Sequence, residues 1–197
     1  MLEAINFLLE EIGATPVADE ESTQPDVAGA RRRLLTAKKA VQRRGYWFNR
    51  DEDITFSPNQ ESEITLPNNT LSYVSHNNAH HVLRGNRLYN SLDSTYKFTE
   101  GTTGLLISDL EWEEIPFSAQ EVIKWMACNT YTRRELEDPA RTQEILMELN
   151  QARMDLRHEE VQTTQLSLNG SPRAVRARSR VRPYSMGRSR NPIHPGG

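Results

Sequence analysis

The sequence predicts an α+β fold: a four-helix bundle with a small antiparallel β-rich insertion between helices two and three, and an extended C-terminal tail. Apolar residues recur at helical spacing on both sides of a central region of short β-prone runs. The last stretch is rich in arginine, proline and serine and cannot bury a core. We expect four segments: 1–50 (helices one and two), 51–114 (insertion), 115–165 (helices three and four) and 166–197 (basic tail).

The N-terminal segment predicts two amphipathic helices. The first is expected near 2–12, where apolar residues are spaced by three or four and Gly13 stands at the position of a helix C-cap. The second is expected near 25–44. Pro25 suits its first turn, because the amide hydrogen that proline lacks would have no partner there. Gly45 closes this helix.

The central segment predicts short strands. Gly85-Asn86 separates two of them and is typical of a two-residue hairpin turn. The expected strands are Thr70 to Ser75, His80 to Arg84, Arg87 to Asn90 and Thr103 to Ser108, with short edge strands at Ile54 to Phe56 and Ile64 to Leu66.

Helical periodicity returns after Pro116, and helices are expected near 117–135 and 139–160. Asp138 fits the N-cap of the last helix and Pro139 its first position. Because four amphipathic helices of this length favour a bundle, their apolar faces should share one core. That core is expected to contain Ile5, Leu9, Leu34, Val41, Val122, Met126, Leu149 and Leu156.

Composition excludes several classes of protein. Of 197 residues, 36 % are hydrophobic and 26 % charged, and no stretch approaches the roughly 18 apolar residues of a membrane span. The first residues lack the basic start of a signal peptide. Cys128 is the single cysteine, which excludes an internal disulfide and a cysteine-based zinc cage. We therefore expect a chain made in a reducing cytoplasm, with no membrane partner.

Four features are candidates for chemistry. His76, His80 and His81 offer metal-binding side chains, although no spaced motif completes a site. The acidic run 109–114 offers a carboxylate pair of the kind that glycosidases use, but such runs are commonly solvated segments. Cys128, in an apolar helical stretch, is interpreted as a buried structural thiol. The aromatic turn 45–49 either stacks on bases or fills the junction between bundle and insertion, and we favour the second role.

The C-terminal tail is strongly basic. Residues 161–197 hold seven arginines and no acid, so that a net charge of −3 for the whole chain leaves −10 on residues 1–160. Alternate arginines of an extended chain project to one side about 6.6 Å apart, which suits carboxylates or phosphates. The candidate partner-binding residues are Arg173, Arg176, Arg178, Arg180, Arg182, Arg188 and Arg190.

An ordered series of runs resembles a known family. The runs are ARRRLLTAKKAVQRRGYWFN (30–49), LPNNTLSYV (66–74), LRGNRLYNSLDSTYKF (83–98) and LEWEEIPFSAQEVIKWMACNTY (110–131). In this order and spacing, over about residues 1–160, they resemble tail tubular protein A, the head-to-tail adaptor of short-tailed phages (podoviruses). Two features depart from the family: Tyr46 stands where tryptophan is more familiar, and the arginine tail is unlike the tails of its members.

The resemblance implies a structural virion protein with no catalysis, no cofactor and no metal. It implies a dodecameric ring at the portal vertex, joining the portal protein to the tail nozzle (tail tubular protein B), with tail fibres at the adaptor–nozzle junction. Such a ring forms part of the channel through which DNA passes without sequence recognition. The implied site is the virion tail, after synthesis in the host bacterium.

Two alternatives come from other classes of protein. A nucleic-acid-binding protein would grip phosphates with its arginine tail, and its DNA affinity would fall steeply with salt. A polysaccharide hydrolase of the tail would use carboxylates of the β-rich insertion and would release reducing sugar. The adaptor predicts neither activity, and it predicts copurification with the portal instead.

Overall fold

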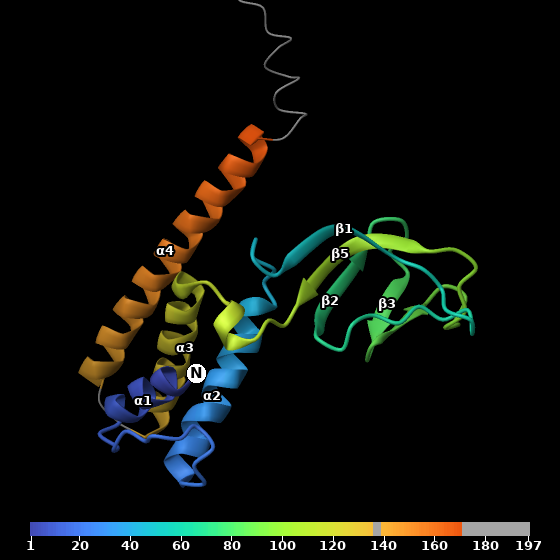
Figure 1. The fold of residues 1–197 in the computed structure, drawn as a ribbon. Coiled ribbons are helices and arrows are strands. Elements are labelled where there is room, and N and C mark those ends of the chain that lie inside the picture. Colours follow the sequence, from blue (N-terminus) through green and yellow to red (C-terminus); the bar gives the residue numbers. More distant parts are fainter. Residues whose placement is uncertain (136–138, 171–197) are drawn as a thin grey trace, which may run out of the picture. The chain divides into compact units, whose positions relative to one another are not determined.

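The computed structural model describes residues 1–135 and 139–170 and has the predicted α+β composition (Figure 1). Met1–Val161 forms one compact unit, and Gln162–Gly197 forms a second. No described helix is long and apolar enough to cross a membrane. The elements are α1 (Leu2–Glu11), α2 (Pro25–Gln42), β1 (Arg50–Phe56), β2 (Thr70–Ser75), β3 (His81–Arg84), β4 (Arg87–Asn90), β5 (Thr102–Ser108), a 3-10 turn (Trp112–Glu114), α3 (Phe117–Glu135) and α4 (Pro139–Gly170).

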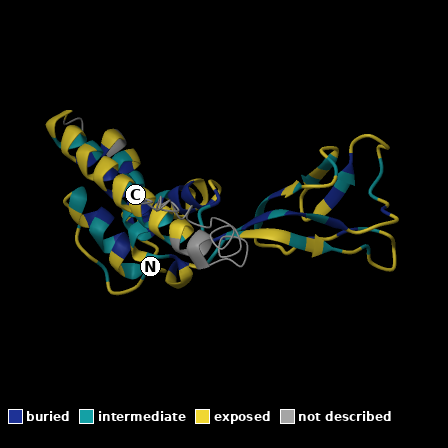
Figure 2. Cartoon of the chain, turned by 90° about the horizontal axis from the view of Figure 1, so that it is seen from above, coloured by how far each residue is buried: buried dark blue, intermediate teal, exposed yellow. Residues whose placement is uncertain are grey.

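The helices share one apolar core. Helices α1, α2 and α3 contact one another pairwise, and α4 adds Leu149, Ala152 and Leu156 to the same cluster. Figure 2 marks the buried positions in dark blue. Seven of the eight expected core residues are buried, including Leu34 and Leu149. Met126 is only half-buried, because it lines a groove between α2 and α3.

Helix boundaries follow the local signals with one large exception. Helix α2 begins at Pro25 and α4 at Pro139, as expected, whereas Asp138 lies outside the described residues. Helix α4 continues to Gly170, so the expected end near 160 is wrong. The apolar periodicity reports burial against the core, and Leu156 is the last buried residue described in α4. Beyond it, helix-forming glutamate and glutamine continue the helix, and residues 157–165 are exposed or half-buried.

The sheet is antiparallel, with strand order β1-β5-β2, and β3 and β4 form a separate hairpin. Strand β1 begins at Arg50, four residues before the expected edge strand, and its register shifts between Asp51 and Ile54. That shift breaks the alternation on which the sequence prediction depends. Gly85 has a positive φ of 64° in the predicted hairpin turn.

The expected strand over Ile64 to Leu66 is absent from the described sheets. Thr65 forms only an isolated bridge with Arg87. Ile64 and Leu66 are nevertheless buried, in a second apolar cluster under the sheet. This segment therefore supplies core side chains without a full ladder, and Pro67, which has no amide hydrogen, follows it at once.

Gly45, directly after α2, is required both by its backbone conformation and by the space around it. Its φ is +72°, and a Cβ there would lie 2.6 Å from the Ile107 Cδ1 atom of β5. Gly85 has a similar φ but open space around it. We expect Gly85→Ala to cost about 1 kcal/mol from backbone strain alone. Gly45→Ala should cost at least about 1 kcal/mol more, because Ile107 must move. Urea unfolding of the two variants measures this difference, and equal losses would contradict the contact.

Candidate functional site

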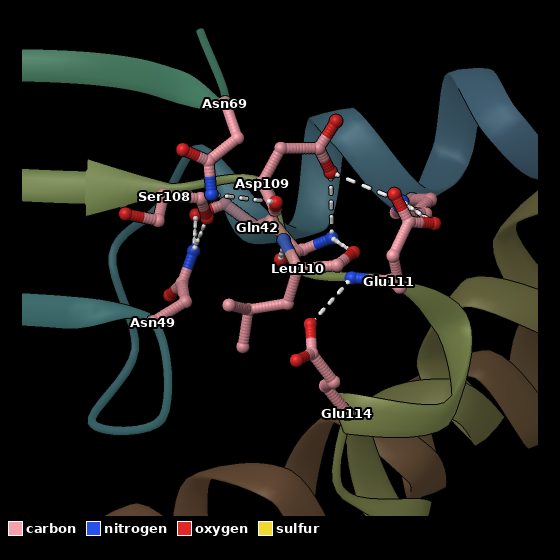
Figure 3. A network of polar contacts seen from close by, with 9 residues as sticks. Gln42, Asn49, Asn69, Ser108, Asp109, Leu110, Glu111 and Glu114 are labelled. Carbon is pink, nitrogen blue, oxygen red and sulfur yellow. Dashed lines mark hydrogen bonds and ion pairs between the residues drawn. The ribbon is translucent and has the colours of Figure 1, made fainter. Parts of the chain in front are cut away.

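A buried polar junction connects the last turn of α2 to the segment after β5 (Figure 3). The Gln42 side chain is fully buried, and its Nε2 donates to Asp109 Oδ1 at 3.0 Å and to the Leu110 carbonyl at 3.1 Å. The Leu110 amide donates in return to Gln42 Oε1 at 2.8 Å. Both ends of the Gln42 amide are therefore satisfied, which fixes its orientation.

Asn49 joins the same two segments from the aromatic turn. Its buried Nδ2 donates to the carbonyls of Gln42 and Ser108, each at 2.8 Å. The Ser108 amide donates to the Asn49 carbonyl at 3.0 Å. On the other side, the Asp109 amide donates to the Asn69 carbonyl at 2.7 Å. The junction therefore fastens the end of α2 to the end of β5 through several independent bonds.

A buried cation completes the junction. Lys38 is only 6 % exposed, and its Nζ lies 3.3 Å from Asp109 Oδ1 and 3.7 Å from Glu111 Oε2. A buried ammonium needs such partners, because its removal from water is costly. Lys38 and Gln42 follow Leu34 at steps of four, which places both on the buried face of α2. That spacing is the sequence signal that would have identified them as junction residues.

The acidic run 109–114 has structural roles. Asp109 and Glu111 receive Lys38, and Glu111 and Glu114 form a reciprocal capping box at the 3-10 turn. Glu113 lies 3.6 Å from the Met1 amino group. All four carboxylates therefore have partners within the chain, and these structural contacts account for the acidic run.

The aromatic turn packs against the helical core. Tyr46, Trp47 and Phe48 are partly buried there. The rings of Tyr46 and Phe48 stack with centroids 5.8 Å apart, and Trp47 meets Phe48 edge-on at 5.2 Å. These contacts support the interpretation of the turn as a plug beside the junction.

The three histidines do not converge on one site. Strand β2 ends at Ser75 and β3 begins at His81, so His76 and His80 do not share a strand. His76 Nδ1 lies 3.2 Å from Asp53 Oδ1, and His81 Nδ1 lies 3.3 Å from Thr102 Oγ1. Within residues 1–135 and 139–170 no group of three potential metal ligands is found.

Cys128 is fully buried in α3, as expected of a structural thiol. Burial, followed by the nearby charge of Glu11, raises the pKa of the thiol to about 12. The thiol therefore stays protonated at neutral and mildly alkaline pH. We expect no reaction with a thiol reagent at pH 8 in the folded protein and one equivalent after denaturation. Rapid labelling of the folded chain would contradict this burial.

The seven candidate arginines of the tail lie outside the residues that the structure describes. The described site is thus a set of hydrogen bonds and ion pairs that joins the helical core to the sheet.

The chain belongs to the tail tubular protein family, whose model matches residues 2–166. It is therefore a structural component of a phage tail. Tail tubular protein A of Klebsiella phage KP34 is 27 % identical over 139 residues, which cover 70 % of this chain and 72 % of that protein. These matches confirm the resemblance that the sequence runs indicated.

Proposed function

We propose that this chain is the head-to-tail adaptor of its phage, a dodecameric ring at the portal vertex between the portal and the tail nozzle. The family match carries the proposal, because it extends over the helices, the sheet and the junction between them. In this ring the four helices form a bundle (segments 1–50 and 115–165), the insertion 51–114 projects from it, and tail fibres attach where the ring meets the nozzle.

The polar junction supports this role. A subunit between capsid and tail must transmit force without a flexible hinge. The bonds of Gln42 and Asn49 and the ion pairs of Lys38 fasten the helical core to the sheet at one place. The buried Gln42 amide holds one geometry, because rotation of its side chain would leave a donor or an acceptor unpaired.

The negative net charge of residues 1–160 supports a role in lining a channel through which DNA slides. Residues 1–160 carry a net charge of −10, which repels a duplex and opposes sticking. The arginine tail has the opposite sign, and a basic lining would retain DNA during ejection. We therefore place the seven arginines on carboxylates of the portal or of an adjacent subunit, away from the lumen.

Binding to the portal tests the function. Full-length protein is mixed with portal rings of the same phage, and the mixture is analysed by sedimentation and electron microscopy. We expect a soluble free subunit that forms a ring beneath the portal. A mixture in which the chain and portal sediment separately at all concentrations would refute the adaptor role.

Removing residues 171–197 tests the tail in the same assay. We expect the truncated chain to keep its helical circular dichroism and to bind portal more weakly. A matched variant with all seven arginines changed to glutamine separates charge from length. Unchanged portal binding together with lost DNA affinity would favour the alternative, a tail that grips nucleic acid, which its seven positive charges also suit.

A further inference from the structure

Two grooves lie on opposite sides of α3, which itself lies between α2 and α4 (Figure 1). The groove between α2 and α3 has a volume of about 430 Å³, and Met126 lines it. The groove between α3 and α4 has a volume of about 260 Å³, and Phe117 lines it. Met126 follows Phe117 by nine residues, which at about 100° per residue is half a turn around the helix.

The groove between α2 and α3 has a basic rim and an apolar floor. Ala37, Ala40 and Met126 line it together with Arg32. Arg32 and Lys39 are exposed and, seven residues apart, lie on the same side of α2. Lys39 lines the adjoining hollow rather than the groove itself, together with Arg32, Glu20 and Glu21. Within the described part of the chain, neither takes part in an ion pair. We call this surface the basic face.

The groove between α3 and α4 is acidic and has an exposed apolar side chain beside it, so it complements the basic face. Its carboxylates are Glu121, Glu148 and Asp155, and Phe117 beside them is 74 % exposed. This is the highest exposure among the large apolar side chains of the described residues. Lys124 pairs with Glu121, which leaves an excess of negative charge on this side. We call this surface the acidic face.

We propose that the acidic face of one copy docks on the basic face of the next. Phe117 then enters the groove between α2 and α3, and Glu148 and Asp155 meet Arg32 and Lys39. The apolar floor favours a protein partner over DNA, because a phosphate backbone makes no use of it. Two different faces on opposite sides of one subunit make a head-to-tail contact, and such a contact builds a ring when the rotation from one copy to the next closes. The inference rests on the proposed adaptor function and assigns the surfaces of its ring.

A disulfide trap tests this contact in the full-length chain. Thr36 on the basic face and Gln151 on the acidic face are exposed, and both are changed to cysteine. The buried Cys128 does not interfere. With and without portal rings, oxidation should give a ladder of dimers, trimers and larger species. Each single variant should give no ladder, and a mixture of the two should stop at dimers.

The matched control carries Asn68→Cys and Glu100→Cys, two exposed positions of the insertion. The Thr36/Gln151 pair should form the ladder at least about tenfold faster than this control, because docked cysteines react at high effective concentration. Equal rates for the Thr36/Gln151 pair and this control, with portal as well as without it, would overturn the proposal. Dimers from a single variant alone would overturn it too, since they indicate that like faces meet.

Charge reversal tests the contact independently. In the chain that carries the Thr36/Gln151 cysteine pair, Arg32→Glu with Lys39→Glu should slow disulfide formation between copies about tenfold. Adding Glu148→Lys with Asp155→Lys should restore the rate. An unchanged ladder, or lost DNA retention in its place, would show that the basic face has another partner. Portal binding is measured in parallel: variants that bind portal without forming the ladder reject only this contact, whereas a wild-type chain that does not bind portal rejects the adaptor role.

Discussion

Leu34→Ala is expected to lower the free energy of unfolding by about 2–5 kcal/mol. Leu34 is 1 % exposed at the centre of the helical core. Alanine there removes apolar contacts and leaves a cavity that the surrounding helices fill only in part. Urea unfolding followed by circular dichroism measures the loss.

Leu35 provides the matched control one residue along α2. Its side chain is 37 % exposed, and Leu35→Ala should cost well under half as much as Leu34→Ala, because less apolar area returns to water. Equal losses for the two variants would contradict the orientation of α2 in the core.

Gln42→Ala is expected to cost about 2–4 kcal/mol. The substitution leaves the half-buried amide and carbonyl of Leu110 without their side-chain partner, and each group left unpaired away from water costs about 1–3 kcal/mol. Amide hydrogen exchange gives a local measurement. The Leu110 amide should exchange much faster in the variant, while amides within the middle of α3 keep their order of protection.

Lys39→Ala serves as the control for that substitution, since Lys39 is exposed on the same helix. It should change the stability by no more than about 0.5 kcal/mol and leave exchange at Leu110 unaltered. If Gln42→Ala also left Leu110 protected, the junction would not depend on the Gln42 side chain.

The spacing of apolar residues, and the prolines and glycines at the ends of helices and strands, predicted most of the fold. Proline fixed the starts of α2 and α4, and the alternation and turn residues located β2 and β4 with their observed limits. These signals are local, because a helix start or a hairpin turn depends on a few neighbouring residues.

The missed features depend on distant contacts. Strand β1 owes its extra residues to pairing with β5, and Arg50 lies opposite Ile107. Ile64 is buried without belonging to a strand, and Lys38 is buried because Asp109, distant in sequence, receives its charge. A charged side chain on α2 ordinarily predicts a solvated position, and only its spacing from Leu34 indicated otherwise.

The pairing of β1 with β5 also affects where the sequence and length of such a chain can vary. The two strands run antiparallel from Arg50 opposite Ile107, next to the junction, to Phe56 opposite Thr102 at their other end. The residues between Phe56 and Thr102 therefore begin and end at a single closed pair. Strand β2 lies within this stretch and pairs with β5. Insertions or deletions in the exposed loops beyond β2 leave the pairing of β1 and β2 with β5, and the helices, in place. Evolution can thus remodel the surface of the insertion while the helical part keeps its sequence.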